Sequence, residues 1–485
     1  MVVSQQSAMA VVLASAGYPE SSSTGDVIQG LEARVDGTSV FHGATSTSNA
    51  NIVTDGGRVL TVVGRGKDLA QARAHAYERV EKISFTGAQY RRDIGWRSLA
   101  LSVKSYSSTG VDIDEGNRAV SLLKSSVAST ANSNVLAGVG SFGGALDVSH
   151  LKKYDHPVLV GSTDGVGTKV ELAARSGRFR GVGMDIVNHC VNDVLVQGAR
   201  PLFFLDYLAS SEIQAEMVAA VVDGISQACR DNECVLLGGE TAEMPGVYSP
   251  GAFDIAGTLV GVAERDQLLP LQNIQAGDVI IGLASDGQAN YETTYNGGMG
   301  SNGLTSARHD VLGKYLANKY PESFDPSVPS DLVYSGSRNL TEAVPGTPLN
   351  VGQLILSPTR TYAPVVKALL TELRPHLHGM VHCSGGAQTK VMHFVNNVHV
   401  IKDNLFSIPP LFDLIQKESG TSFKEMYQVF NMGHRLEVYA NPAHADEIIR
   451  ISQSFGIPAQ IVGRVEASAT KKLTISSPYG EFIYE

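Results

Sequence analysis

Short apolar runs alternate with longer stretches of helical periodicity over most of the chain, a pattern that predicts an α/β protein. The first hundred residues differ, because several β-rich runs follow one another there before a single amphipathic helix. The turn signals Asp36-Gly37 and Asp55-Gly56-Gly57 separate these runs. The predicted strands are 11–13, 40–41, 59–63, 158–160, 202–206, 235–237, 255–262 and 279–283, and the predicted helices are 68–82, 112–124, 180–197 and 215–229.

Two breaks in this pattern predict domain boundaries. A polar, serine-rich segment at 102–114 is typical of a linker, and a second α/β pattern begins after a break at 267–276. A chain of 485 residues is long enough for about three domains. We therefore expect a small N-terminal domain, a linker with an entry segment, and two α/β domains, with bounds 1–100, 101–155, 156–270 and 271–485.

Composition narrows the class of protein. The formal net charge of −10 at pH 7 argues against a dedicated binder of nucleic acid or anionic membrane, since such binders need a basic surface. The apolar run 8–16 is too short to span a membrane and lacks the basic flank of a signal peptide. Four cysteines without a CxxC pair fit reduced thiols in the cytoplasm. Fifty glycines indicate loops whose backbone approaches a ligand closely.

The segment 162–169, Ser-Thr-Asp-Gly-Val-Gly-Thr-Lys, lies between a predicted strand and a helix. Gly165 and Gly167 let the backbone approach a ligand, and the free amides of a helix start favour anions. In this interpretation Lys169 contacts a phosphate and Asp164 holds a divalent cation. The segment is not a P-loop, which needs GxxxxGK[ST], and a tight turn with a surface lysine explains it equally well.

The predicted helix 180–197 carries polar residues in an apolar setting. Asp185 and Asn192 are seven residues apart, so one helix face can present both. Asn192 and Asp193 interrupt the apolar stretch 186–196, where a buried acid needs a cation or hydrogen-bond partners. The alternatives are an ordinary polar helix end or hydrogen bonds between subunits.

A second glycine-rich segment, 238–246, follows another predicted strand as a loop with the sequence Gly-Gly-Glu-Thr-Ala-Glu-Met-Pro-Gly. Two glycines, two acids and a threonine suit metal-bridged phosphate binding. The alternative is a glycine turn in which Thr241 caps the chain.

Two weaker signals remain. The glycine cluster 137–144 lacks the order strand, GxGxxG, helix, so it is no dinucleotide fingerprint and fits a phosphate-gripping flap or a plain linker. His382 beside Cys383 invites a nucleophile–base interpretation. Adjacent residues rarely present both side chains to one site, however, so an ordinary core or capping histidine is favoured.

Taken together, the motifs resemble the phosphoribosylformylglycinamidine cyclo-ligases, also called AIR synthetases, over residues 106–485. The segments that carry this resemblance are 110–114, 163–169, 190–193, 196–199, 201–207, 238–246, 357–360 and 430–433. Residues 1–100 instead resemble the C-terminal domain of phosphoribosylamine–glycine ligase (GAR synthetase), through the segments 17–19, 25–28, 40–42, 56–60 and 90–96. The ATP-grasp body of that ligase does not precede Met1, so we expect no glycine-ligase activity.

The cyclo-ligase resemblance implies a two-domain α/β (α+β) fold with mixed sheets, behind the small β-rich domain. It also implies a homodimer joined through the first of the two domains, with ATP in a groove between domains. The expected reaction is the ATP-dependent closure of formylglycinamidine ribonucleotide to aminoimidazole ribonucleotide, with release of ADP and phosphate. Other enzymes of purine biosynthesis are expected partners.

The same resemblance assigns roles to single residues. Asp164, Lys169 and Asp193 are the expected catalytic residues. The expected Mg²⁺ ligands are Asp164, Asp185, Asp193 and Glu240. Contacts to the ATP phosphates or the ribonucleotide are expected from Gly165, Gly167, Thr168, Asn192, Gly238, Gly239, Thr241, Arg360, Ser384 and Asn431.

This chain also departs from the common cyclo-ligase pattern. Gly300 stands where the family has a histidine, an insertion occupies 291–298, and the later glycine triplet ends in Ala387. The half from about 273 onward resembles a longer family variant, which raises the hypothesis of a chimera and leaves the general base unnamed. The alternative function is a catalytically inactive nucleotide-binding or assembly module of the purine pathway. Formylglycinamidine synthetase, selenophosphate synthetase and thiamin-monophosphate kinase share the superfamily, but the segment 238–246 favours the cyclo-ligase.

Overall fold

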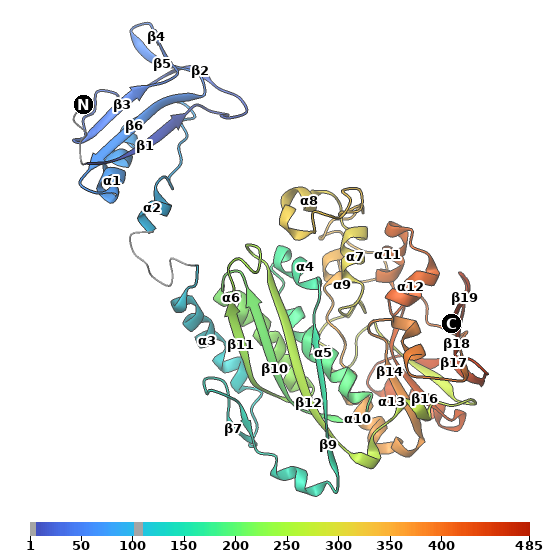
Figure 1. Cartoon of the computed structure of the whole chain (residues 1–485). Helices are drawn as coiled ribbons and strands as arrows, with labels where there is room; N and C mark the ends of the chain where they lie inside the picture. The colour runs from blue at the N-terminus through green and yellow to red at the C-terminus, as the bar shows by residue number, and fades with distance from the viewer. Residues whose placement is uncertain (1–5, 101–109) are drawn as a thin grey trace. The chain divides into compact units, whose positions relative to one another are not determined.

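The computed structural model describes residues 6–100 and 110–485. The chain divides into two compact units, Met1–Gly110 and Val111–Glu485, and each is described by itself (Figure 1). Most of the serine-rich segment that predicts a linker, 101–109, lies outside the described residues. Beyond it, α3 (Ile113–Ala128) begins at the N-cap Asp112, whose carboxylate accepts the amides of the first turn.

The first unit is a small β-rich domain with α1 (Leu69–Val80) on its main sheet. Gly64 allows this close packing, because an added Cβ would lie 2.2 Å from the Ala72 carbonyl oxygen. The main antiparallel sheet has the order β1 (Ser7–Ala14), β6 (Arg58–Gly66), β3 (Thr38–His42). The remaining elements are β2 (Thr24–Val27), β4 (Thr45–Ser48), β5 (Asn51–Asp55) and α2 (Trp96–Ala100).

The second unit begins with a four-stranded mixed sheet of order β11-β10-β12-β9, in which only β10 and β11 run parallel. α5 and α6 lie against one face of this sheet (Figure 1). The elements are β7 (Val135–Ala137), β8 (Ala145–Leu146), β9 (Pro157–Gly165), α4 (Lys169–Ser176), α5 (Arg180–Leu195), β10 (Arg200–Ser210), α6 (Ala215–Asp231), β11 (Val235–Glu243) and β12 (Phe253–Glu264).

Glycines bring α5 and α6 together. A Cβ on Gly183 would lie 2.0 Å from the Val221 carbonyl oxygen, and one on Gly224 would lie 2.0 Å from that of Arg180. The two helices therefore pack backbone against backbone, and α5 is buried along most of its length. This packing fixes the helix that carries most of the predicted acidic residues.

The second half of this unit is built on a seven-stranded mixed sheet of order β14-β16-β13-β17-β15-β18-β19. Its strands are β13 (Val279–Ala284), β14 (Leu377–His382), β15 (Val398–Lys402), β16 (His434–Ala440), β17 (Ala459–Ala467), β18 (Lys472–Ser477) and β19 (Gly480–Tyr484). Its helices are α7 (Leu304–Val311), α8 (Tyr315–Lys319), α9 (Val351–Ile355), α10 (Ala363–Glu372), α11 (Pro410–Ser419), α12 (Phe423–Val429) and α13 (Ala445–Ser454).

The predicted fold class is confirmed, with mixed sheets and helices in the long unit and a β-rich domain before it. Each strand and helix predicted from the sequence coincides with an observed element, and most of these elements bury part of their apolar residues in a core. No helix among the described residues is long and apolar enough to cross a membrane.

Candidate functional site

Four strands align one residue each in a single row across the first sheet of the second unit. The row contains Gly239, Asp206, Gly257 and Asp164. Residues of one row point to the same face, which here is the face covered by α5 and α6. A Cβ on Gly239 would lie 2.2 Å from Asp206 Oδ1, so glycine at this position leaves room for the acid.

Asp206 is not among the residues that the sequence predicts for the site. Desolvation by burial raises the pKa of Asp206 to about 7, and the nearby Glu240 carboxylate adds to the shift. The feature of the sequence that could have identified Asp206 is an acidic residue directly after the apolar run 202–205. A carboxyl group with this pKa changes its charge near neutral pH, next to the expected phosphate site.

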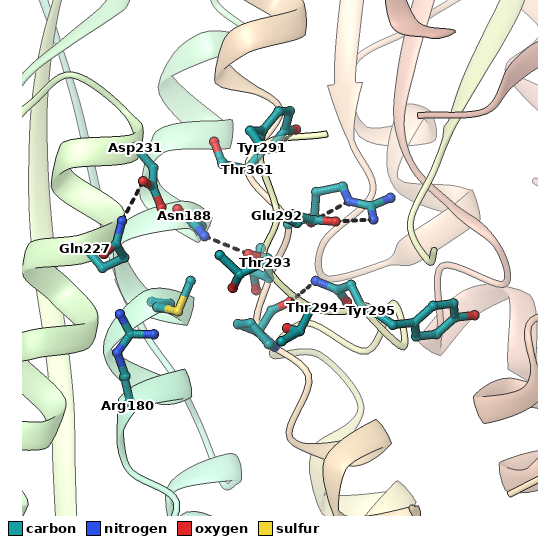
Figure 2. Close-up of a pocket in the computed structure, with 15 residues that line it drawn as sticks. Arg180, Asn188, Gln227, Asp231, Tyr291, Glu292, Thr293, Thr294, Tyr295 and Thr361 are labelled. Atoms are coloured by element: carbon teal, nitrogen blue, oxygen red, sulfur yellow. Dashed lines mark hydrogen bonds and ion pairs between the residues drawn. The ribbon is translucent and has the colours of Figure 1, made fainter. Parts of the chain in front are cut away.

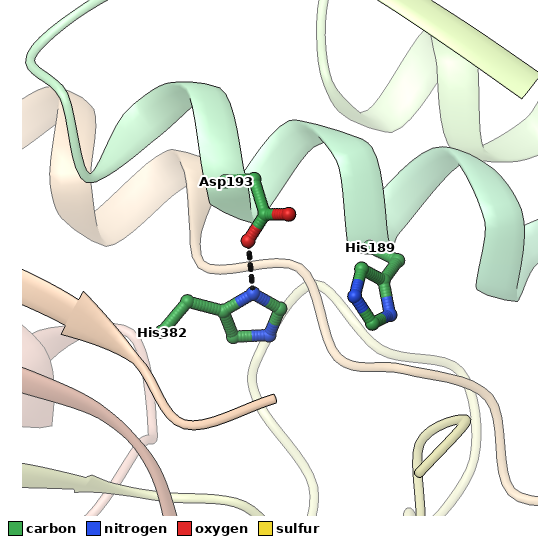
Figure 3. Close-up of side chains that lie close together, drawn as sticks. All are labelled: His189, Asp193 and His382. Carbon is green, nitrogen blue, oxygen red and sulfur yellow. Dashed lines mark hydrogen bonds and ion pairs between the residues drawn. The ribbon is translucent and has the colours of Figure 1, made fainter. Parts of the chain in front are cut away.

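Two buried histidines each contact one of the acids predicted to be catalytic, and Figure 3 shows His189 beside the pair of His382 and Asp193. His189 Nε2 lies 2.9 Å from Asp164 Oδ2, and His382 Nδ1 lies 2.8 Å from Asp193 Oδ1. The imidazole rings stand edge to face with centroids 5.2 Å apart. Both histidines are buried, whereas the Asp164 and Asp193 side chains are 39% and 35% exposed.

The electrostatics of this group favour charged carboxylates. Although desolvation by burial works in the opposite direction, the hydrogen bonds from His189 and His382 hold the pKa of Asp164 and Asp193 below their ordinary values. Burial in turn lowers the pKa of His382 to about 4, against the effect of Asp193. At neutral pH the group therefore carries two negative charges that face solvent and two buried imidazoles.

Lys169 and Asp185 form a fully buried ion pair, in which Asp185 lies one helical turn before His189 on α5. Lys169 Nζ is 2.7 Å from Asp185 Oδ2 and also donates to the carbonyl oxygens of Gly300 and Ser357, at 3.0 and 2.6 Å. Asp185 Oδ1 accepts the amide and the hydroxyl of Thr359, at 2.7 and 2.8 Å. The sequence-based expectation places Lys169 at a phosphate and Asp185 at a metal ion, and in this structure protein groups enclose both side chains.

Asn192, Arg360 and Asn431 also use their side chains on the protein itself. Asn192 donates to the Arg360 carbonyl at 2.9 Å and accepts the Tyr362 amide at 3.0 Å. Arg360 is buried and forms a two-bond ion pair with Glu292 at 2.8 and 2.7 Å. Asn431 donates to the Gly298 carbonyl at 2.8 Å. These residues connect α5 with the segment that follows α9 and with the insertion, rather than lining an open site.

The segment 238–246 is not the loop that its glycines predicted. β11 continues through it to Glu243, because the backbone pairs with β10 up to Ser210. Glu240 pairs with Tyr207 and is exposed, and alternation along the strand directs it to the face opposite Asp206. The strand therefore separates Glu240 from the pair of Asp164 and Asp193.

Comparison with known proteins assigns these domains. Residues 8–97 match the family described as phosphoribosylglycinamide synthetase, C domain. Residues 147–263 and 275–476 match the N-terminal and C-terminal domains of AIR synthase related protein. Phosphoribosylformylglycinamidine cyclo-ligase of Carboxydothermus hydrogenoformans is 38% identical over 373 residues, covering 75% of this chain and 96% of that protein. The chain belongs to the phosphoribosylformylglycinamidine cyclo-ligase family.

Fused relatives match the cyclo-ligase part together with the domain before it, and they confirm both resemblances. The trifunctional purine biosynthetic protein adenosine-3 of Gallus gallus is 38% identical, over 94% of this chain and 43% of that protein. The bifunctional purine biosynthetic protein purD of Dictyostelium discoideum is 34% identical, over 97% of this chain and 56% of that protein. This chain thus spans about half the length of these relatives.

Among solved structures, E. coli HypE, a hydrogenase maturation protein, is similar with a TM-score of 0.50 and 17% identity, over 75% of this chain and 95% of that one. At this identity the likeness shows the fold alone.

Gly300 is the position at which the resemblance to the cyclo-ligases led us to expect a histidine. Its φ is +64°, and an added Cβ would lie 2.0 Å from the guanidinium nitrogens of Arg435. Arg435 is buried and donates to the Met299 carbonyl at 2.6 Å. The arginine therefore occupies the space that a side chain at 300 would need, which gives a packing reason for the glycine.

We expect Gly300→Ala to lower the free energy of unfolding by about 2–4 kcal/mol, through left-handed strain plus the clash with Arg435. Gly177→Ala is the matched control, because Gly177 has a φ of +66° and no atom within 4 Å of an added Cβ. The free energy of unfolding of this control should fall only through left-handed strain, by about 1–2 kcal/mol. Urea denaturation measures both, and equal losses would show that Arg435 moves aside freely.

The segment 291–298, which the sequence predicts to be an insertion, lines a cavity of about 150 Å³ against α5 and α6 (Figure 2). Tyr291 donates to the Thr361 carbonyl at 2.6 Å, and Glu292 holds Arg360. Arg180 and Asp231 lie on the helices that form the opposite wall. The insertion therefore packs against the first half of the unit, and none of the predicted metal ligands lines this cavity.

Among the predicted site residues, the structure thus brings together Asp164 and Asp193 and adds His189 and His382 to them. His382 and Cys383 do point to different surroundings, since the Cys383 thiol lies near Glu437 inside the second sheet. His189 lies one helical turn before Asp193, and this spacing was the signal that could have identified it.

Proposed function

We propose that the unit Val111–Glu485 closes the imidazole ring of a purine precursor. In this reaction, formylglycinamidine ribonucleotide and ATP give aminoimidazole ribonucleotide, ADP and phosphate. The observation that carries the proposal is the pair of partly exposed carboxylates, Asp164 and Asp193, each fixed by a buried histidine. Membership of the cyclo-ligase family supports the choice of substrate.

The chemistry explains why charge must be held in place. An amide oxygen is a poor leaving group, so the γ-phosphoryl group of ATP is first transferred to it. The neighbouring amidine nitrogen then forms the new C–N bond, the C–O bond breaks, and phosphate leaves with the oxygen. Phosphoryl transfer depends mainly on positioning and charge stabilisation, which rigid carboxylates can provide through a metal ion.

The proposed metal set is Asp164 and Asp193. Carboxylate oxygens are the ligands that Mg²⁺ prefers, and Asp193 Oδ2 has no hydrogen bond from the described residues, so the donor set fits. A bound Mg²⁺ would neutralise the charge of the triphosphate. Asp185 is left out of the proposed set because it is paired with Lys169. Glu240 is left out as well, because it lies on the opposite face of the sheet.

The loop between β9 and α4 is the proposed phosphate contact. An added Cβ on Gly167 would meet no atom within 4 Å, so the backbone there is open to a ligand. Thr168 lies at the start of α4, and its hydroxyl is 2.8 Å from that of Thr305 on α7. The remaining proposed contacts are Gly165, Gly238, Gly239, Thr241 and Ser384, with the loop 138–144 as a flap between β7 and β8.

We further propose a cytoplasmic homodimer that associates with other purine enzymes. The face of the first sheet away from α5 and α6 carries the exposed side chains Leu159, Leu205 and Tyr207, of which Leu159 is 63% exposed. Burial of such a surface against a second copy is favourable. All four cysteines are free and buried, as expected for a reducing compartment.

The decisive experiment gives the purified full chain formylglycinamidine ribonucleotide and Mg²⁺–ATP and measures aminoimidazole ribonucleotide. We expect product that depends on both substrates, with one phosphate released per ring closed. ATP hydrolysis without the ribonucleotide, or ATP binding without product, would overturn the proposal in favour of an inactive module. A glycine-ligase assay on the same sample shows whether any activity resides in the first unit.

A further inference from the structure

The two histidines beside the carboxylates form a cluster that the proposed reaction does not use. His189 and Asp193 are four residues apart on α5 and therefore share one helix face, while His382 ends β14. One ligand atom from each of the three lies within 4.8 Å of the others (Figure 3). Two elements far apart in sequence thus direct imidazole and carboxylate groups to one point.

Each imidazole has one satisfied and one unsatisfied nitrogen. His189 Nδ1 and His382 Nε2 are buried and have no hydrogen-bond partner. The other nitrogen of each ring faces a carboxylate, Asp164 for His189 and Asp193 for His382. A buried polar atom without a partner costs about 1–3 kcal/mol, which favours a ligand at His189 Nδ1. Asp164 holds the far nitrogen of this ring, which is the usual arrangement behind a histidine that ligates a metal. His382 offers Nδ1, which lies 2.8 Å from Asp193 Oδ1, so these two side chains exchange their hydrogen bond for bonds to one ion.

We propose that His189, Asp193 and His382 bind a divalent transition-metal ion of the Zn²⁺ or Co²⁺ class. Imidazole nitrogens favour these ions, whereas Mg²⁺ favours oxygen ligands. Metal–nitrogen bonds of about 2.0–2.1 Å place tetrahedral ligand atoms about 3.3 Å apart, so the three side chains approach one another slightly on binding. The exposed sides of Asp164 and Asp193 give the ion a path to the site.

A second group with ligand spacing shows why this cluster is the better candidate. Cys383, His434 and Glu437 also offer atoms within 4.8 Å of one another, but all three are buried. Glu437 is already the partner of Lys402 in a fully buried ion pair and accepts from Tyr439 at 2.7 Å. The Glu437 carboxylate of that group already has protein partners, and none of the three residues is exposed. The cluster at His189 instead contains a buried nitrogen without a hydrogen-bond partner and a partly exposed carboxylate.

One consequence rests on the proposed function. Asp164 and Asp193 belong to the proposed Mg²⁺–triphosphate site, so a transition metal at the imidazoles should compete with Mg²⁺–ATP. Zn²⁺ is then expected to raise the KM for Mg²⁺–ATP in the ring-closing reaction. Metal binding itself needs neither ATP nor ring closure, so the metal site can be tested independently of the proposed function.

The test titrates the tag-free full chain with Co²⁺ in excess Mg²⁺, following the visible absorption of bound Co²⁺ and the heat of binding. We expect a single bound ion per chain and intense bands of low coordination number. His189→Gln and His382→Gln should each weaken Co²⁺ binding by at least about tenfold, the lower end of the effect of changing a supporting group. Displacement of Co²⁺ by the excess Mg²⁺ would overturn the proposal.

His378→Gln is the matched control, because His378 Nδ1 also lies 2.7 Å from a carboxylate, that of Asp278, outside this cluster. It should leave the affinity for Co²⁺ unchanged. An equal loss in His378→Gln, or unchanged affinity in both cluster variants, would contradict the proposed site. X-ray absorption on the Zn²⁺-loaded wild-type chain adds a measurement that needs no variant: two imidazole ligands are expected, and fewer would overturn the assignment.

Discussion

Replacing Asp193 with asparagine is expected to lower kcat for ring closure by about 10²–10³-fold. The change removes one negative charge from a preorganised site, and single groups of this kind contribute about this much to catalysis. Asparagine has nearly the same shape and can still accept the hydrogen bond from His382, so the fold should be preserved. Steady-state formation of aminoimidazole ribonucleotide measures the effect, together with the affinity for Mg²⁺–ATP.

Asp331→Asn is the control for this experiment, because Asp331 is exposed and lies outside the proposed site. Its kcat should equal that of the wild type, and the melting temperature of both variants should stay close to the wild-type value. Asp164→Asn should behave like Asp193→Asn, since both carboxylates belong to the proposed metal set. Unchanged ATP turnover in either site variant would refute the assignment of these acids.

Replacing Lys169 with methionine is expected to lower the free energy of unfolding by about 3–5 kcal/mol. The substitution leaves Asp185 buried without its cation, and breaking a buried pair on one side costs about this much. Burial already lowers the pKa of Lys169, and the Coulombic attraction of Asp185 opposes that shift. Chemical denaturation of the full chain, followed by far-UV circular dichroism, measures the loss.

The matched control is Lys367→Met, which breaks the exposed ion pair with Glu233 at 2.7 Å. Both of its side chains are more than half exposed, so the expected loss is only about 0–1 kcal/mol. The double variant Lys169→Met with Asp185→Asn should recover part of the stability, because no uncompensated charge remains buried. Equal effects in the two single lysine variants would contradict a structural role for Lys169.

The helices and strands were predictable because their signal is local. The apolar run along 202–205 and the apolar stretch along 180–197 match β10 and α5, since both elements bury most of their residues in the core. The glycines were harder to interpret. Gly239 was expected in a ligand loop, yet it lies in a strand beside Asp206, and Gly183 and Gly224 are packing sites between helices. A glycine signals close approach, but the sequence does not say whether a ligand or another part of the protein makes that approach.

The acidic residues show the same limit. Asp164 lies in a glycine-rich segment and Asp185 and Asp193 lie on an apolar helix, and all three were expected to bind metal. The fold encloses Asp185 with Lys169 and leaves Asp164 and Asp193 partly exposed, because the partner groups come from segments more than a hundred residues away or from the next element.

By itself the sequence determined the family, the mixed α/β fold and the residues from which a site could be built. Those properties depend on local period and on long, ordered motifs. Only the tertiary structure decided which of these residues face solvent and which satisfy one another inside the protein. Which residues are exposed depends on contacts between distant segments, such as His382 with Asp193 and Arg435 with Gly300. A local sequence pattern does not contain these contacts, so it does not predict which charged residues are buried.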